Sequence, residues 1–317
     1  MAKDQVTKEP TKEGLGDILS DPQEANVDIV FVHGLGGDRK ETWTWKNDHR
    51  SVFWPQELLP EDCPTARILS FGYNADFAHF YPFSPKTIAP ELTVDNYSTS
   101  LFQSLAGLRE KTNTIERPVI FVAHSLGGLV VANALSRPQG TDTAAQAIAD
   151  HTVGTVFLGT PFEGSSIAGY GALAVDFLSN FTSAQTGNLK LLKERSEKLE
   201  TISQLFAKYL KGRDRSQTLP YLEVACFFEE RNLYKGIKKI GLIVDKKSAS
   251  WLGVDALSIP KDHIQMCKFE DKDDSDYKSV AAKLRQLIAD GQKSRDPTKG
   301  GLLGVNAQVC RLLLLSF

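Results

Sequence analysis

The chain has 317 residues, of which 41% are hydrophobic and 24% are charged, as in an ordinary soluble globular protein. This length suits one large α/β domain or two small ones. The net charge of −2 gives no electrostatic support for nucleic-acid binding, and no apolar run is long enough to span a membrane.

The cysteines and the N-terminus indicate the compartment. Four cysteines occur without C-x-x-C spacing, which favours buried free thiols over a zinc site or a disulfide framework. The first ten residues lack the apolar core of a secretory signal, and their acidic residues argue against a transit peptide. We therefore expect an intracellular, cytoplasmic protein.

The first predicted strand leads into a glycine-rich loop. Residues 1–26 are charged and aperiodic, which predicts a mobile tail, whereas residues 27–32 form an apolar run typical of a buried strand. The loop that follows is His33-Gly34-Leu35-Gly36-Gly37. It lacks both the Gly-Lys-Ser/Thr of a phosphate loop and the third glycine of a dinucleotide fingerprint. A structural turn or an oxyanion loop, with the N–H of Leu35 or a neighbour as donor, fits better.

Two tryptophans and a further strand precede the centre of the chain. Trp43 and Trp54 either line a pocket or anchor the loop on the core. Residues 66–73 predict another strand, and residues 95–111 have the apolar spacing of an amphipathic helix.

The most informative stretch lies at residues 119–135. An apolar run at 119–123 predicts a buried strand, and a helical pattern follows directly after His124-Ser125-Leu126-Gly127-Gly128. A serine between strand and helix, with small residues two positions before and after it, is typical of a nucleophile elbow. Ala123 and Gly127 occupy those two positions. The alternative is a plain turn that happens to contain a serine.

Alternating elements continue to the C-terminus and predict an α/β fold with a mainly parallel, doubly wound sheet. Strands are expected at 153–161, at 221–228 before Glu229, and at 240–244 before Asp245. The insertion at 164–212 is mostly helical and is either a lid or a set of covering helices. A closing helix is expected at 276–289, and the pattern of 291–317 gives no fold-based role.

A serine nucleophile requires a base and an orienting acid that follow it in the order Ser, acid, His. Of six histidines, only His263 follows the last predicted strand; the others are His33, His49, His79, His124 and His151. Carboxylates at strand ends rank Glu229 first, Asp245 second and Glu230 third. Asp255 and Asp262 are weaker candidates because acid and base normally come from different loops.

These residues predict acyl transfer. His263 would take the proton of Ser125, whose oxygen attacks an ester or amide carbonyl, while the N–H groups of Leu35 and Leu126 hold the oxyanion. The loop and elbow glycines that permit this are Gly34, Gly36, Gly127 and Gly128. This reaction requires no metal or organic cofactor, and the sequence contains no His-Glu-x-x-His zinc motif.

The combination of motifs resembles the lipase-like α/β-hydrolase family of serine-active-site-containing proteins, which is related to GPI inositol-deacylases. Similar domains stand at the N-terminus of fungal receptor-like proteins. The motifs are residues 32–37, 43–44, 54–55, 66–73, 123–128, 158–161 and 262–263. The resemblance implies an α/β-hydrolase domain at 27–290, with Ser125 as nucleophile and His263 as base. A Phe-x-Glu pattern in the family matches Phe227-Phe228-Glu229 and supports Glu229 as the acid.

Two functions are therefore open. The first is a serine esterase or lipase that cleaves a carboxylic ester, with an acyl-ester substrate that is either a lipid or a small molecule. The second is a hydrolase-fold module for signalling or protein interaction with weak or no catalysis. The family resemblance also leaves peripheral contact with a mitochondrial or endoplasmic-reticulum membrane open, and the oligomeric state is unknown.

Overall fold

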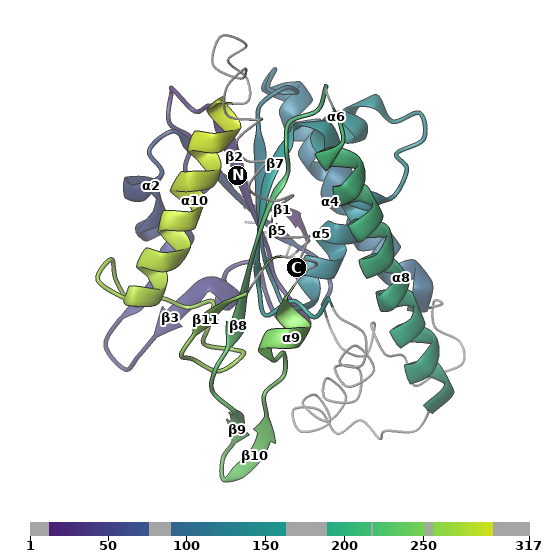
Figure 1. Ribbon diagram of the computed structural model, residues 1–317. Helices are drawn as coiled ribbons and strands as arrows, with labels where there is room; N and C mark the ends of the chain where they lie inside the picture. The colour runs from purple at the N-terminus through teal and green to yellow at the C-terminus, as the bar shows by residue number, and fades with distance from the viewer. Residues whose placement is uncertain are drawn as a thin grey trace, which may run out of the picture.

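A computed structural model of the chain describes residues 13–75, 90–162, 189–216, 218–250, 254 and 256–293 (Figure 1). At its centre lies a seven-stranded sheet with the order β1 (Gly14–Leu15), β5 (Ala66–Gly72), β2 (Val27–Val32), β6 (Val119–His124), β7 (Thr152–Leu158), β8 (Glu223–Glu229) and β11 (Leu257–Ile259). Within this sheet β1 is antiparallel to β5, and the other neighbours are parallel. The predicted, mainly parallel α/β architecture is confirmed.

Helices cover both faces of the sheet because its strands are apolar on both sides. Every residue of β2, β6 and β7 is buried. One face carries α1 (Trp54–Glu57), α2 (Leu59–Asp62) and α10 (Ser275–Lys293), and the other carries α4 (Pro90–Lys111), α5 (Leu126–Ser136), α6 (Thr143–His151) and α8 (Leu189–Asp214) (Figure 1). The sheet is therefore doubly wound, and the two hydrophobic cores lie on its opposite faces.

The N-terminal segment corrects the prediction of a mobile tail up to residue 26. Gly14 and Leu15 pair with Gly72 and Phe71 of β5, and the Leu19 N–H donates to the carbonyl of Ile68 at 2.9 Å. This segment covers the edge of β5, whose backbone groups would otherwise lack partners. Residues 1–12 lie outside the described residues.

The segment after β8 corrects a second prediction. Residues 240–244 were expected to form a strand of the main sheet, but β9 (Leu233–Lys235) and β10 (Lys238–Gly241) form a separate antiparallel hairpin. The short helix α9 (Lys246–Ala249) follows, and β11 then takes the sheet position beside β8. A three-residue strand carries too short a pattern to be recognised by periodicity.

The helical insertion at 164–212 falls partly outside the described residues, at 163–188. Its second half is α8, where Leu199, Ile202 and Phe206 are buried in the core formed with α5. This part of the insertion packs as a covering helix, and the alternative of a lid stays a prediction for residues outside the described ones. Of the C-terminal segment 291–317, the structure describes only the first three residues, which end α10 at Lys293; the rest lies outside the described residues.

The tryptophans are anchors and do not line a pocket. Trp43, which ends the 3₁₀ turn η1 (Glu41–Trp43), and Trp54 are both fully buried and pack edge-on against Phe31 at 5.0 and 5.1 Å between ring centroids. The Trp54 indole N–H donates to the Cys267 carbonyl at 2.9 Å. The loop between β2 and β5, with its hairpin β3 (Thr44–Lys46) and β4 (Ser51–Phe53), is thereby fixed on the core.

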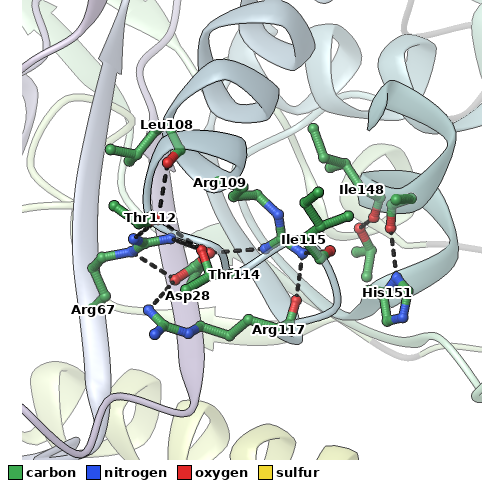
Figure 2. A network of polar contacts seen from close by, with 12 residues as sticks. Asp28, Arg67, Leu108, Arg109, Thr112, Thr114, Ile115, Arg117, Ile148 and His151 are labelled. Atoms are coloured by element: carbon green, nitrogen blue, oxygen red, sulfur yellow. Dashed lines mark hydrogen bonds and ion pairs between the residues drawn. The ribbon is translucent and has the colours of Figure 1, made fainter. Parts of the chain in front are cut away.

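A buried charge cluster holds the amino ends of the parallel strands (Figure 2). The Asp28 carboxylate at the start of β2 accepts two hydrogen bonds of 2.8 Å from Arg67 at the start of β5. Arg109 of α4 donates a third at 2.8 Å, and Arg117 a fourth at 3.2 Å. Burial lowers the pKa of Arg109, and the Asp28 charge opposes that shift. The cluster ties α4 to two central strands at the edge opposite the end of β6.

Three cysteines lie in the described part of the chain. Cys63, Cys226 and Cys267 are free and buried, as predicted, and burial raises the pKa of each to about 12. Among the described residues, no helix combines the length and apolar character needed to cross a membrane.

Candidate active site

Ser125 occupies a strained turn between β6 and α5. Its backbone has φ 55° and ψ −129°, a region that residues other than glycine rarely adopt. The turn is held because the Ser125 N–H donates to the Leu158 carbonyl at 2.9 Å, and the Ser125 carbonyl accepts from the Thr160 hydroxyl at 3.0 Å. The strain raises the hydroxyl above the end of the sheet, as an elbow requires.

Three glycines allow this turn to pack tightly. A Cβ on Gly127 would lie 2.2 Å from the His33 carbonyl oxygen, and one on Gly128 would lie 2.1 Å from the Thr160 hydroxyl. A Cβ on Gly34 would lie 2.6 Å from the Cβ of Ser125. The loop after β2 therefore lies directly against the serine. A side chain at Gly34 or Gly127 would push this loop away from the elbow, and one at Gly128 would displace Thr160.

The loop after β2 is shaped by His33 and Tyr73. The Tyr73 N–H donates to His33 Nε2 at 3.2 Å, its hydroxyl donates to the His33 carbonyl at 2.8 Å, and the two rings stack at 4.4 Å. His33 Nδ1 therefore carries the proton and donates to the Gly34 carbonyl at 2.9 Å. Burial lowers the pKa of His33 to about 4, so the ring is neutral at neutral pH.

Two backbone N–H groups near Ser125 are available as donors. Leu126 is the first residue of α5, where an N–H has no partner within the helix. Within the described residues, no backbone hydrogen bond uses the N–H of Leu35 either. In the same loop, Gly36 has φ 66° and donates to the Ala75 carbonyl at 2.9 Å.

The structure brings Ser125, His263 and Glu229 together from three strand ends. His263 Nε2 lies 3.0 Å from Ser125 Oγ, and His263 Nδ1 lies 3.3 Å from Glu229 Oε2. An ionised carboxylate can only accept, so Nδ1 carries the proton and Nε2 faces the serine hydroxyl with its lone pair. This is the tautomer in which His263 can act as a base toward Ser125.

Glu229 is rigidly oriented at the end of β8. Its side chain is fully buried, and Oε1 accepts from the N–H groups of Ile243 at 2.8 Å and Val244 at 2.5 Å. Both amides follow the β9–β10 hairpin. They turn the second oxygen, Oε2, toward His263.

None of the other candidate carboxylates that the structure describes has a hydrogen bond to the His263 ring. Asp245 caps α9, where it accepts from the Ser248 N–H at 2.8 Å and from the Ser248 hydroxyl. Asp262 caps the turn before His263 by accepting from the Ile264 N–H at 3.0 Å. Glu230 is exposed, and Asp255 lies outside the described residues. Asp245 was ranked second because residues 240–244 were expected in the main sheet; the hairpin removes that reason.

Two neighbours of His263 were not assigned a role from the sequence. His124 Nε2 donates to the His263 carbonyl at 2.8 Å, and burial lowers the pKa of His124 well below its usual value, so it stays neutral. Gly159 has φ 59°, and a Cβ there would lie 3.0 Å from His263 Cε1. The one available signal was position, since His124 is the last residue of β6 and Gly159 directly follows the neighbouring strand β7.

Two of the remaining histidines, His49 and His151, lie in described segments outside this group. His151 ends α6, and its Nδ1 donates to the Ala147 carbonyl at 2.8 Å. His49 is exposed in the turn between β3 and β4, and His79 lies outside the described residues.

Comparison with known families decides the affiliation of this fold. Residues 29–252 match the model of a family described as "Alpha/beta hydrolase family". The chain belongs to the alpha/beta hydrolase family. This membership confirms the expected fold class and supports a hydrolase.

Several relatives of this alpha/beta hydrolase are known. The chain is 31% identical to Protein SERAC1 of Danio rerio over 283 residues and 27% identical to that of Homo sapiens over 284 residues. Each match covers 84% of this chain but 40% of the relative, so the chain spans less than half of the length of these relatives. The predicted resemblance to serine-active-site-containing proteins is confirmed.

Two of the solved structures that align with this chain are titled an esterase and a lipase. The Pyrococcus furiosus esterase PF2001 aligns with a TM-score of 0.45 at 11% identity, over 84% of this chain and 82% of the other. The Bacillus licheniformis lipase BlEst2 aligns with a TM-score of 0.45 at 19% identity, over 86% of this chain and 96% of the other.

Proposed function

We propose that this alpha/beta hydrolase is a serine hydrolase that cleaves a carboxylic ester through an acyl-enzyme on Ser125. The observation that carries the proposal is the continuous path from Ser125 Oγ through His263 to Glu229, with separations of 3.0 and 3.3 Å. These lie at or just beyond hydrogen-bond reach, and such bonds tighten when substrate binds.

The first half-reaction forms the acyl-enzyme. His263 Nε2 accepts the proton of Ser125 as Oγ bonds to the ester carbonyl carbon, and the N–H groups of Leu35 and Leu126 hold the oxyanion. His263 then gives the proton to the leaving alkoxide as the carbon–oxygen bond breaks. The Glu229 carboxylate stabilises the imidazolium formed in between.

The second half-reaction repeats these steps with water as the nucleophile. His263 takes a proton from water as the water oxygen bonds to the acyl carbon; the bond between that carbon and Ser125 Oγ then breaks, His263 returns the proton to Oγ, and the carboxylic acid leaves. The chemistry requires no metal or organic cofactor. We propose an acyl-ester substrate, with lipids included.

The test is fluorophosphonate labelling together with turnover of short-chain p-nitrophenyl esters. Ser125→Ala and His263→Ala should each lower kcat by about 10⁴-fold or more, and Ser125→Ala should abolish labelling. Ser136→Ala is the matched control, because Ser136 lies at the far end of α5 and its buried hydroxyl has no hydrogen-bond partner among the described residues.

Unchanged labelling of Ser125→Ala would refute the proposal. Absence of labelling and turnover in the wild type, with lipid esters also tested, would instead favour a signalling or interaction module with weak or no catalysis.

A further inference from the structure

The β9–β10 hairpin projects from the edge of the sheet at which β8 ends (Figure 1). Its strands pair Lys235 with Lys238 and Tyr234 with Lys239, and a two-residue turn of Gly236 and Ile237 joins them. Gly236 has φ 57°, whereas Ile237 has no positive φ, which matches a type II′ turn with glycine first. A Cβ on Gly236 would meet no atom within 4 Å, so the turn stands clear of the described parts of the protein.

One face of the hairpin belongs to the core and the other is open. Leu233 is buried, and Ile240 packs against the same core. The residues that alternate with them point outward, where Tyr234 is 56% exposed and Lys239 is exposed. At the tip, Ile237 reaches 104% of its reference exposure. A fully exposed isoleucine and a half-exposed tyrosine thus lie together on one projecting hairpin, and apolar side chains grouped on a surface mark an interaction site.

The charges around this tip indicate the class of partner that the hairpin binds. Residues 230–247 contain six basic and two acidic side chains, a net charge of +4 in a chain whose total is −2. Arg231, Lys239, Lys246 and Lys247 are exposed. An apolar tip flanked by basic residues complements an anionic lipid surface, where the tip enters the interface and the cations meet headgroups.

The same composition disfavours a protein partner. Lysine is depleted in protein–protein interfaces, while tyrosine beside lysine is typical of the membrane–water boundary. A narrow convex turn also offers less area than a stable protein interface buries.

We propose that the β9–β10 hairpin docks this protein on anionic membrane surfaces, with Ile237 and Tyr234 inserted and the exposed Lys239, Lys246 and Lys247 on the headgroups. Docking does not depend on the chemistry of Ser125. Docking also has a consequence for the chemistry of Ser125, and this consequence rests on the proposed function. The hairpin begins and ends beside the buried Glu229 and the two amides that hold it, so docking turns the carboxyl edge of the sheet toward the lipid.

The experiment is sedimentation of the full chain with two kinds of vesicle. One kind is pure phosphatidylcholine, and the other contains about 30 mol% phosphatidylserine. The hairpin variant is Ile237→Ser with Lys239→Glu. The matched control is Ile115→Ser with Lys111→Glu, which changes one exposed apolar and one exposed basic side chain in and before the loop leading to β6, at the opposite edge.

The wild type and the matched control should bind the anionic vesicles. Added salt should weaken this binding because it screens the attraction between the basic side chains and the anionic headgroups. Each basic residue near an anionic surface contributes about fivefold to binding, so the hairpin variant should bind at least about tenfold more weakly. Ser125→Ala should bind like the wild type, which separates docking from catalysis. The hairpin variant should also retain turnover of a water-soluble ester.

Equal binding to both vesicle types, or equal loss in the hairpin variant and the matched control, would overturn the proposal. A wild type that ignores both vesicles but forms dimers, which the hairpin variant converts to monomers in gel filtration, would identify a second copy of the chain as the partner instead.

Discussion

Replacement of Glu229 by glutamine tests the acid of the proposed triad with almost no change in shape. Glutamine keeps a carbonyl oxygen for the N–H groups of Ile243 and Val244, which now hold Oε1 at 2.8 and 2.5 Å. Its amide group then faces His263 Nδ1 in place of Oε2. Two donors would meet there, so the imidazole moves its proton to Nε2.

This change of tautomer lowers the rate of catalysis. With the proton on Nε2, His263 presents a donor to Ser125 and cannot accept its proton. A triad carboxylate replaced by its amide lowers kcat by about 10⁴-fold, which corresponds to about 5.5 kcal/mol of activation free energy. Because the backbone hydrogen bonds remain, the free energy of unfolding should change by no more than about 2 kcal/mol.

The assay is p-nitrophenyl ester turnover with a urea unfolding curve for each variant. Asp245→Asn is the matched control, because Asp245 only caps the four-residue helix α9. Because asparagine caps a helix about as well as aspartate, it should change the free energy of unfolding by less than about 1 kcal/mol and kcat by less than about tenfold. The reasoning fails if Glu229→Gln keeps more than about a tenth of the wild-type kcat, or if Asp245→Asn shows the larger loss.

Three further predictions follow from the packing and burial of the chain. Gly159→Ala places a Cβ 3.0 Å from His263 Cε1 at a backbone φ of 59°, so kcat should fall at least about tenfold while labelling at saturating fluorophosphonate persists; unchanged kcat would contradict this contact. Asp28→Asn leaves the buried Arg67 and Arg109 without their counter-charge, and urea unfolding should show a loss of about 3–5 kcal/mol, whereas a loss below about 1 kcal/mol would argue against a charged cluster. His33 has a pKa lowered to about 4, below its unfolded value, so it binds fewer protons when folded; its contribution is full above about pH 6.5 and is lost, by about 3 kcal/mol, as the pH falls toward 4. Between pH 7 and pH 4, the free energy of unfolding of the wild type should therefore fall more steeply than that of His33→Gln, as unfolding curves at pH 4, 5, 6 and 7 would show, and parallel pH dependences would refute the assignment.

Elements with strong local patterns can be predicted from the amino-acid sequence alone. Residues 119–123 are apolar without interruption, and a strand buried on both faces has no other pattern, so the run predicts β6 directly. Ser125 and Gly127 then mark the elbow, since only small residues fit where a Cβ would meet the His33 carbonyl at 2.2 Å. His263 could be selected by elimination because the chain has six histidines.

The tertiary structure decided what depends on contacts between distant segments. Glu229 and Asp245 both follow apolar runs, and the choice between them turned on whether residues 240–244 join the main sheet or the hairpin, which is a matter of pairing partners rather than local pattern. Residues 14–15 look like a tail because a two-residue strand is stable only through the edge of β5 that it covers.

The same reason explains the groups that the sequence left without a role. Asp28, Arg67 and Arg109 are scattered charges along the chain, and only the register of β2 and β5 with the end of α4 makes them one buried cluster. His124 was a neighbour of the serine until the fold brought the His263 carbonyl to 2.8 Å from it. Local sequence fixes which segments are strands and helices because backbone and side-chain preferences act over a few residues, whereas a site assembled from strand ends depends on which strands become neighbours.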